Sequence, residues 1–222
     1  MKEVHINTII AGFLQKINYF VYNITMHTKL DHIYFNASPY FIAKDLLGRL
    51  LSTNIDNHIT SGIIVETEIY RGGEKDKASH AHFLKKTKRT NIMFSNGGYC
   101  YVYLVYGIYY QFCITTSQMG IPDTILIRAL EPRDGIDTMK QRRHQSVNLT
   151  NGPGRLTQAL GIDKDLHEKS ITGSQIWISK DKEYKRFKIV KSKRIGIGYS
   201  DEYSQSLMWR FYIKDNKFIS KK

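Results

Sequence analysis

The chain has 222 residues, of which 41% are hydrophobic, and 33 lysines and arginines against 20 acidic residues give a formal net charge of +13. This length is typical of one domain with a sizeable core, and the basic excess attracts polyanions, although a ribosomal or a peripheral membrane protein would also fit the charge. The two cysteines, Cys100 and Cys113, lie outside any zinc-ligand pattern, which excludes a disulfide framework and a structural zinc site.

The first thirty residues are mildly apolar, but polar residues such as Asn7, Lys16 and Asn23 interrupt them. This pattern is typical of neither a membrane span nor a signal peptide. We expect residues 1–30 to form an amino-terminal extension, either a poorly ordered arm or a stretch upstream of a true start at Met26. Residues 31–222 are expected to form one domain.

The predicted elements begin with a helix over 39–51, where apolar residues recur at helical spacing behind the cap candidates Asn36 to Ser38. Strands follow over 61–70 and, after the turn Asn96-Gly97-Gly98, over 99–110; a short strand is expected over 125–129. Helices are predicted over 134–143 and 154–160, a tail of alternating basic and apolar residues over 185–197, and a last strand over 209–213. The fold class is therefore α+β, a single domain built on a curved, mainly antiparallel sheet.

The strand over 61–70 carries two carboxylates and an aromatic ring at every second position. Side chains two apart in a strand share a face, so Glu66, Glu68 and Tyr70 face one space together with Ile64. The alternative is an exposed strand edge with solvated glutamates, because polar and apolar positions alternate in half-buried strands.

Tyrosines alternate in the next strand, where Tyr99, Tyr101 and Tyr103 share a face. They form either core or, combined with the positive charge, a surface on which an unpaired base stacks. His80 and His82 would point the same way on a strand, but no carboxylate or cysteine completes a ligand set, so no metal is expected.

Several segments of the chain, in order, resemble the alkyladenine (3-methyladenine) DNA glycosylase family over about Tyr34 to Ser220. The matching runs are Gly62-Ile-Ile-Val-Glu-Thr-Glu-Ile-Tyr70, Asp76-Lys-Ala-Ser-His80, Arg89-Thr-Asn-Ile-Met-Phe94, Tyr101-Val-Tyr-Leu-Val-Tyr-Gly107, Ile127-Arg-Ala-Leu-Glu-Pro132, Asn151-Gly-Pro-Gly-Arg-Leu156, Arg194-Ile-Gly-Ile197 and Trp209-Arg-Phe-Tyr212. The resemblance implies a mixed fold with a tyrosine-bearing β-hairpin and an enzyme that hydrolyses N-glycosyl bonds in DNA.

The resemblance also implies catalytic roles. Glu68 corresponds to the general base that activates water, and Arg128 to its partner in orienting that water. Glu66 matches an acidic position of the family that is not catalytic, so it is expected to be structural or to pair with a nearby basic residue.

The base-binding residues follow in the same way. Tyr70, His80 and Tyr103 would sandwich the extruded base, and Tyr106 would wedge into the duplex. Cys113 stands where the family usually carries an asparagine thought to obstruct the exocyclic amine of guanine. We therefore expect weaker discrimination against guanine-derived bases; the alternative is an altered pocket with weak activity on neutral lesions such as hypoxanthine.

The expected activity is monofunctional base excision repair: release of 3-methyladenine and 7-methylguanine, with ethenoadenine and hypoxanthine as further candidates, leaving an abasic site. No lysine stands where a Schiff-base nucleophile is expected, and no nucleotide-cofactor motif is present, so no cofactor is expected. Candidate phosphate contacts are Lys85, Lys86, Lys88, Arg89, Arg155 and the stretch from Lys185 to Arg194.

The expected partner is double-stranded DNA with a damaged purine, with no membrane; the protein is expected to be a monomer and to be intracellular, in the cytoplasm or at the nucleoid. Two other classes stay open. One is a non-catalytic damaged-DNA-binding module, which has no use for a carboxylate such as Glu68 beside a polyanion. The other is an RNA-modifying or nucleoside-processing enzyme, against which the wedge at Tyr106 argues.

Overall fold

The computed structural model describes residues 28–73, 75–180 and 186–221. Its eight strands form one antiparallel sheet, in the order β3-β4-β5-β2-β1-β6, with β8 added to β2 and β7 to β8. The strands are β1 (Leu50–Ile55), β2 (His58–Tyr70), β3 (Cys100–Val105), β4 (Tyr109–Thr116), β5 (Asp123–Pro132), β6 (Ile176–Ser179), β7 (Ile189–Ser192) and β8 (Arg210–Ile213). The predicted α+β class with an antiparallel sheet is confirmed.

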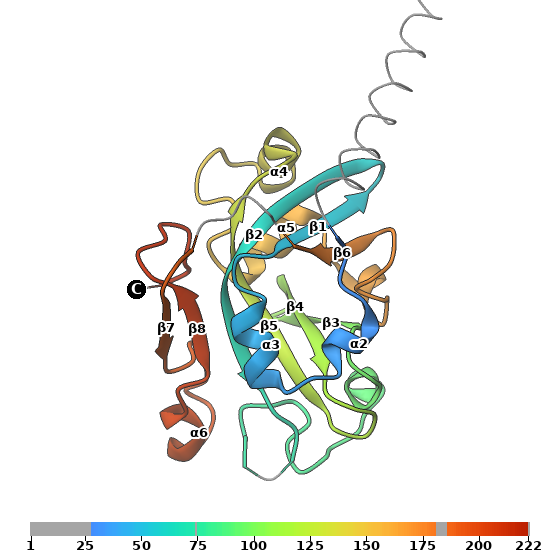
Figure 1. Cartoon of the computed structure of the whole chain (residues 1–222), viewed down its shortest axis with the longest axis vertical. Helices are drawn as coiled ribbons and strands as arrows, with labels where there is room; N and C mark the ends of the chain where they lie inside the picture. Colours follow the sequence, from blue (N-terminus) through green and yellow to red (C-terminus); the bar gives the residue numbers. More distant parts are fainter. Residues whose placement is uncertain (1–27, 74, 181–185, 222) are drawn as a thin grey trace, which may run out of the picture.

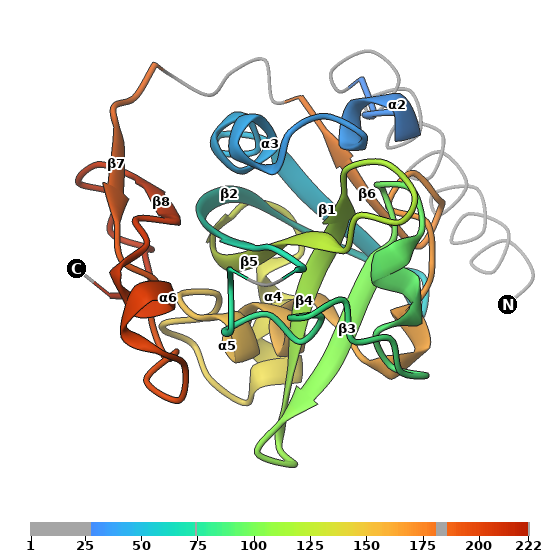
Figure 2. The same ribbon diagram turned by 90° about the horizontal axis from the view of Figure 1, so that it is seen from below.

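Helices cover the curled sheet, as Figures 1 and 2 show. They are α2 (His32–Phe35), α3 (Pro39–Asp45), α4 (Ile136–Arg143), α5 (Pro153–Leu160) and α6 (Glu202–Ser206), with short 3-10 turns η1 (Asn91–Phe94) and η2 (Lys164–Leu166). Helix α3 packs against β2, β5 and β8, whereas α5 packs against β4 and β5. No helix in the described part of the chain is long and apolar enough to cross a membrane.

Strand β2 organises the sheet because it is long enough to have different partners along one edge. Its first half pairs with β1 and its second half with β8, while β5 lies along the other edge. The register with β5 shifts on both sides of Glu66, and such bulges bend a strand and re-aim its side chains. Strand β2 therefore curls the sheet at the point where its two glutamates lie.

The helix predicted over 39–51 is shorter than expected. It ends at Asp45 with Leu46 as its C-cap, and Leu50 and Leu51 belong to β1. Gly48 has a φ of +83°, a conformation that glycine adopts at little cost, and its N–H donates to the Ile64 carbonyl. The chain thus turns out of the helix and into the sheet within a few residues.

The strand predicted over 99–110 is a hairpin. Its turn lies at Tyr106 and Gly107, whose φ values are +53° and +68°, and the Ile108 N–H donates to the Val105 carbonyl at 3.1 Å. Positive φ at both central residues is what a type I′ hairpin turn requires. The hairpin of β3 and β4 projects from the body of the protein in Figure 2.

The other predicted elements are confirmed with shifted ends: the strand over 125–129 extends to Asp123–Pro132, the helices over 134–143 and 154–160 correspond to α4 and α5, and the strand over 209–213 is β8. Strands β1, β6 and β7 and helices α2 and α6 were not predicted. Of the amino-terminal extension, residues 1–27 lie outside the described residues. Lys29 bridges Ser179, and the Leu30 N–H donates to the Ile178 carbonyl, so the described end of this segment lies along β6.

Candidate active site

The two carboxylates of β2 are completely buried. Glu66 and Glu68 both have no exposed surface, and Tyr70 is only partly exposed at the end of the strand. The alternative of solvated glutamates on an exposed strand edge is therefore wrong. A buried carboxylate is costly unless it is paired and hydrogen-bonded, so its partners decide what each glutamate can do.

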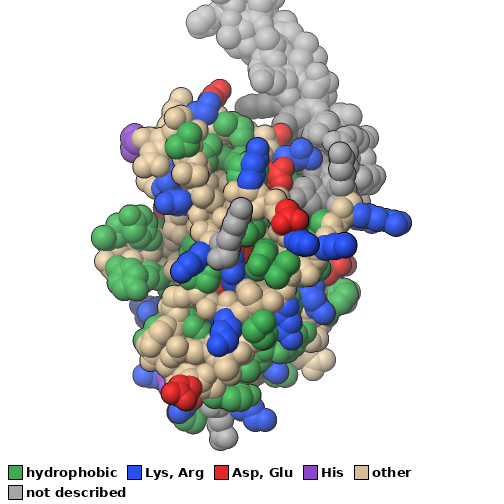
Figure 3. Space-filling view, turned by 90° about the vertical axis from the view of Figure 1, so that its left-hand side faces the viewer, with side chains coloured by type: hydrophobic (Ala, Val, Ile, Leu, Met, Phe, Trp, Pro, Cys, Tyr) green, Lys and Arg blue, Asp and Glu red, His purple; other side chains and the backbone are tan. Residues whose placement is uncertain are grey.

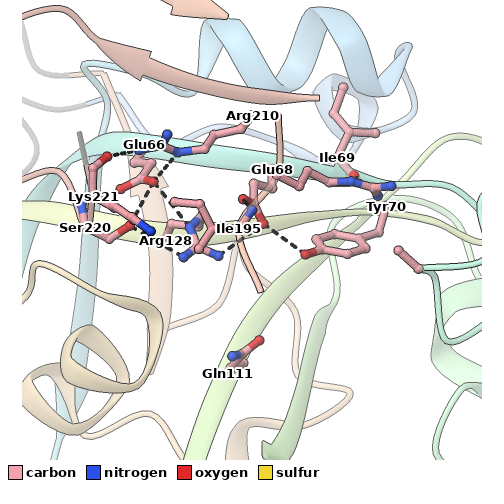
Figure 4. Close-up of polar contacts among 12 residues, drawn as sticks. Glu66, Glu68, Ile69, Tyr70, Gln111, Arg128, Ile195, Arg210, Ser220 and Lys221 are labelled. Carbon is pink, nitrogen blue, oxygen red and sulfur yellow. Dashed lines mark hydrogen bonds and ion pairs between the residues drawn. The ribbon is translucent and has the colours of Figure 1, made fainter. Parts of the chain in front are cut away.

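The Glu68 carboxylate accepts hydrogen bonds from three separate segments, shown in Figure 4. The Ile195 N–H donates to Oε1 at 2.8 Å, while the Tyr70 hydroxyl and Arg128 Nη1 donate to Oε2 at 2.9 and 3.1 Å. Burial raises the pKa of Glu68 above its ordinary value, although Arg128, the Ile195 N–H and Tyr70 act in the opposite direction. A carboxylate with a raised pKa is a stronger base than a solvated one.

Arg128 joins the two glutamates. Its Nε donates to Glu66 Oε1 at 3.2 Å, and its Nη1 reaches Glu68. Glu66 also accepts from Arg210 Nε at 2.6 Å and from the N–H and hydroxyl of Ser220 at 2.6 and 2.9 Å. Glu66 therefore pairs with basic residues, which is one of the two roles expected for it.

A cavity of about 440 Å³ lies against this network and brings most predicted site residues together. Its lining includes Tyr70, His80, Tyr103, Tyr106, Cys113 and Arg128, together with Ile195. The three donors to Glu68 thus line the cavity, and the Glu68 carboxylate lies directly behind them. A concave, largely aromatic pocket with a few convergent polar groups is typical of a ligand site.

His80 forms one wall of the cavity, although it lies in a turn rather than on the strand expected for it and His82. Its Nδ1 shares a hydrogen bond of 2.7 Å with the Tyr101 hydroxyl, and its ring packs edge-on against Tyr103 at 4.7 Å. Burial, with smaller contributions from Arg89 and His82, lowers the pKa of His80 to about 4. The imidazole is therefore neutral near pH 7.

Two of the predicted tyrosines, Tyr101 and Tyr103, line the cavity. Tyr101 is only 2% exposed and also belongs to a small buried cluster. The Tyr103 hydroxyl donates to Gln111 Oε1 at 2.8 Å. Cys113 on β4 is opposite Tyr101 in the register and 2% exposed. Burial raises the pKa of the Cys113 thiol, so this side chain lines the cavity as a small neutral group.

Tyr106 lies at the tip of the hairpin, 89% exposed. A bulky residue rarely adopts a positive φ, and such strained conformations concentrate at functional sites. Other hydrophobic residues of the hairpin tip are also exposed, namely Leu104, Ile108 and Tyr109. Figure 3 shows hydrophobic side chains projecting from one edge of the molecule.

Basic side chains surround the cavity. Arg89 lines the cavity and, with Lys85, a second hollow on the other side of His80, and Arg155 lines a third that shares Arg128 with the first. Lys86 is exposed, with its ammonium 5.3 Å from the Phe94 ring centroid. Lys and Arg side chains are spread over the face in Figure 3, with few acidic ones among them.

The structure leaves fewer candidates for phosphate contacts in the stretch from Lys185 to Arg194. Lys185 lies outside the described residues. Arg194 is 6% exposed and paired with Asp76, which removes it from the candidates.

Sequence reasoning missed part of the site. The runs from Arg194 and from Trp209 marked the right segments, but nothing in them signalled that the Ile195 N–H reaches Glu68 or that Arg210 reaches Glu66. Among the residues that the structure describes, no group of three or more His, Cys, Asp or Glu side chains is placed to hold a metal ion.

Comparisons with known proteins agree with this geometry. A sequence profile of the methylpurine-DNA glycosylase family matches residues 33–217. Candidate 3-methyladenine DNA glycosylases of Natranaerobius thermophilus and Alkaliphilus oremlandii are each 42% identical to this chain, over 197 and 204 residues. The matches cover 86% and 87% of this chain and 98% and 100% of those relatives. A protein of the same name from Desulfitobacterium hafniense is 39% identical over 204 residues, 87% of this chain and 99% of its own length. The chain belongs to the methylpurine-DNA glycosylase family and is a DNA glycosylase, a hydrolase of N-glycosyl bonds.

Proposed function

We propose that this enzyme flips an alkylated purine out of double-stranded DNA and hydrolyses its N-glycosidic bond in one step, leaving an abasic site. The observation that carries the proposal is the fully buried Glu68 carboxylate behind the wall of an aromatic cavity. Its three donors line that cavity, so the carboxylate lies next to the space that an extruded nucleotide would occupy. Glu68 then acts as the general base and Arg128 helps to orient the attacking water.

The hydrogen bonds of Glu68 support this role. An ionised carboxylate offers about four acceptor positions, and three are taken by Ile195, Tyr70 and Arg128. The remaining position can accept a proton from water. An alkylated purine carries positive charge and is already a good leaving group, so the enzyme needs mainly to deliver hydroxide and to stabilise an oxocarbenium-like sugar. One carboxylate near the anomeric carbon serves both purposes.

The aromatic walls favour a cationic base. Tyr70, His80 and Tyr103 surround the cavity, and electron-rich rings attract a cation placed over their faces. Because the pKa of His80 is about 4, the imidazole adds no positive charge that would repel such a base. We propose 3-methyladenine as a substrate, since the relatives are named for it, and 7-methylguanine, ethenoadenine and hypoxanthine as further lesions to test.

The exposed hairpin supplies the means of flipping. Tyr106 would enter the duplex and fill the gap left by the extruded nucleotide, which offsets the lost stacking. Lys85, Lys86, Arg89 and Arg155 would contact phosphates and give affinity that depends on salt but not on sequence. A non-catalytic damaged-DNA-binding module would gain nothing from burying an acidic side chain beside this polyanion, and Glu68 therefore favours the hydrolase.

The test is release of free base from a duplex that contains one 3-methyladenine or 1,N6-ethenoadenine, measured in EDTA for the native protein and for Glu68→Gln. We expect Glu68→Gln to bind the duplex but to release base about 10²–10⁴-fold more slowly. Asp137→Asn, a substitution of an exposed carboxylate, is the matched control and should keep the native rate. Binding without release by the native protein, or a native rate in Glu68→Gln, would overturn the proposal; strand cleavage without alkali would overturn its monofunctional part.

A further inference from the structure

Arg194 and Asp76 form a buried ion pair next to the candidate active site. Arg194 is 6% exposed and Asp76 is 1% exposed. Two parallel hydrogen bonds join them, from Nη1 to Oδ2 at 2.8 Å and from Nη2 to Oδ1 at 2.7 Å. Such a bidentate pair fixes the plane of the guanidinium as well as its position.

The guanidinium of Arg194 holds the end of β2 that carries the site. Its Nη1 also donates to the Ile69 carbonyl at 2.8 Å, between Glu68 and Tyr70. Its central carbon lies 4.7 Å from the centroid of the Tyr70 ring and 5.1 Å from that of Trp209. Arg194 therefore supports the ring whose hydroxyl donates to Glu68.

Arg194 is also the residue before Ile195, whose backbone N–H is the second donor to Glu68. Fixing the Arg194 side chain against Asp76 fixes the backbone from which this N–H projects. Two of the three donors to Glu68 thus depend on one ion pair, and the third, Arg128, is held separately by Glu66.

Asp76 extends the same support to the opposite wall of the cavity. Its carboxylate accepts from the Arg71 and Ala78 N–H groups at 3.0 and 3.2 Å, which ties down both ends of the loop leading to His80. The pair therefore connects Glu68, Tyr70 and His80, although neither of its members lines the cavity.

We propose that Arg194 and Asp76 are positioning residues of this enzyme: their ion pair sets the two donors, Tyr70 and the Ile195 N–H, that orient the Glu68 carboxylate for water activation. The proposal rests on Glu68 being the general base.

Disturbing the ion pair should change how the rate depends on pH, because hydrogen bonds to a carboxylate favour its ionised form. Removing the two donors leaves burial less opposed, so the pKa of Glu68 rises further and the acid limb of the rate profile moves to higher pH. The titratable and charged groups around Glu68 that share in this balance are Glu66, Tyr70, Asp76, Cys113, Arg128, Arg194, Tyr199 and Arg210.

The experiment compares native protein with Arg194→Lys and Asp76→Asn in single-turnover base release from the 1,N6-ethenoadenine or 3-methyladenine duplex between pH 5 and 8. Arg194→Lys keeps the charge but loses the bidentate geometry. We expect both variants to release base about tenfold to a hundredfold more slowly, with duplex affinity within about threefold of native. The acid limb should move to higher pH in Arg194→Lys, which keeps both charges of the pair. Arg49→Lys, which disturbs the Arg49–Asp45 pair of α3, is the matched control and should change neither the rate nor the limb.

The outcomes separate the two proposals. If Glu68→Gln keeps the native rate, the proposed function fails; if only Glu68→Gln is slow and the other variants keep the native acid limb, the positioning proposal fails alone. The double variant should lose no more activity than the slower single variant, and independent losses that multiply would contradict the ion pair as the common cause. Should Arg194→Lys not fold, Asp76→Glu carries the same test, because it keeps both charges and displaces the carboxylate by one methylene group.

Discussion

Glu66 and Glu68 lie two residues apart on the same strand and are equally buried, but they have different surroundings. Glu66 accepts four hydrogen bonds, from Arg128, Arg210 and the N–H and hydroxyl of Ser220. Two guanidinium groups thus surround it. Glu68 accepts three hydrogen bonds, only one of them from a guanidinium, and its donors line the cavity.

The different surroundings give Glu66 a structural role and leave Glu68 as the candidate for chemistry. Two guanidinium groups compensate the charge of Glu66, and the N–H and hydroxyl of Ser220 hold it from a third side, so this carboxylate is fixed in place. Glu68 has a single guanidinium partner, its three donors line the cavity, and burial raises its pKa. The side of the network around Glu66 therefore holds Arg128 and the segment of Ser220, whereas the side around Glu68 lies against the cavity.

The largest expected effect that tests this comparison is on stability. Glu66→Gln leaves Arg210 without its carboxylate, and breaking a buried ion pair by removing one partner costs about 3–5 kcal/mol.

Glu68→Gln should behave differently. Burial raises the pKa of Glu68 in the folded protein above its value in the unfolded chain. The folded protein therefore loses stability as the pH rises through these two pKa values and Glu68 ionises. A neutral glutamine removes this unfavourable charge at pH 7.

Urea unfolding at pH 7 measures both variants. We expect Glu68→Gln to lie within about 1 kcal/mol of the native free energy of unfolding, with most of its activity lost, and Glu66→Gln to be much less stable. Equal losses of stability in the two variants would mean that the two carboxylates are not divided between structure and chemistry.

A smaller effect is expected from His80, on the pocket side. Its pKa is lowered to about 4 in the folded protein, from an ordinary value of 6.5, chiefly by burial. The unfolded chain therefore takes up the proton first as the pH falls. The contribution of neutral His80 to the free energy of unfolding is therefore complete above pH 6.5 and is lost as the pH falls toward 4. Between pH 7 and pH 5 the loss is about 1–2 kcal/mol, with partial exposure of the ring taken into account.

His80→Gln should remove this part of the pH dependence. The measurement is the free energy of unfolding in urea at pH 7 and pH 5, for native protein and variant, with His58→Gln as the control for an exposed histidine. The difference between the two pH values should shrink in His80→Gln and stay native in His58→Gln. The same loss of stability in all three proteins would place the titration elsewhere.

The sequence predicted the fold better than it predicted where elements end. The residues from Leu46 to Leu51 fit both a helical period and a buried strand, and the left-handed turn at Gly48 decides between them. Strands β6 and β7 are only four residues long each, which is too short for a periodic signal. The hairpin was predicted as a single strand because tyrosines continue through its turn.

The sequence likewise predicted part of the candidate site and missed the rest. Alternation along one strand placed Glu66, Glu68 and Tyr70 on a shared face, and the matching motifs supplied Arg128 and His80. The Ile195 N–H is a backbone group 127 residues from Glu68 in the chain, and no side-chain pattern marks it. The support that Arg194 gives to Tyr70 likewise arises only from packing.

The smallest expected effect concerns Cys113, which lines the cavity as a small neutral side chain. Asparagine at this position adds bulk and an amide where the exocyclic amine of guanine would approach. We expect Cys113→Asn to lower release of 7-methylguanine relative to 3-methyladenine by about tenfold, which is in the range of a single altered pocket contact. Both bases are measured in competition from one methylated duplex, and Cys113→Ala, which adds no bulk, should keep the native ratio. An unchanged ratio in Cys113→Asn would show that this position does not control discrimination between the two bases.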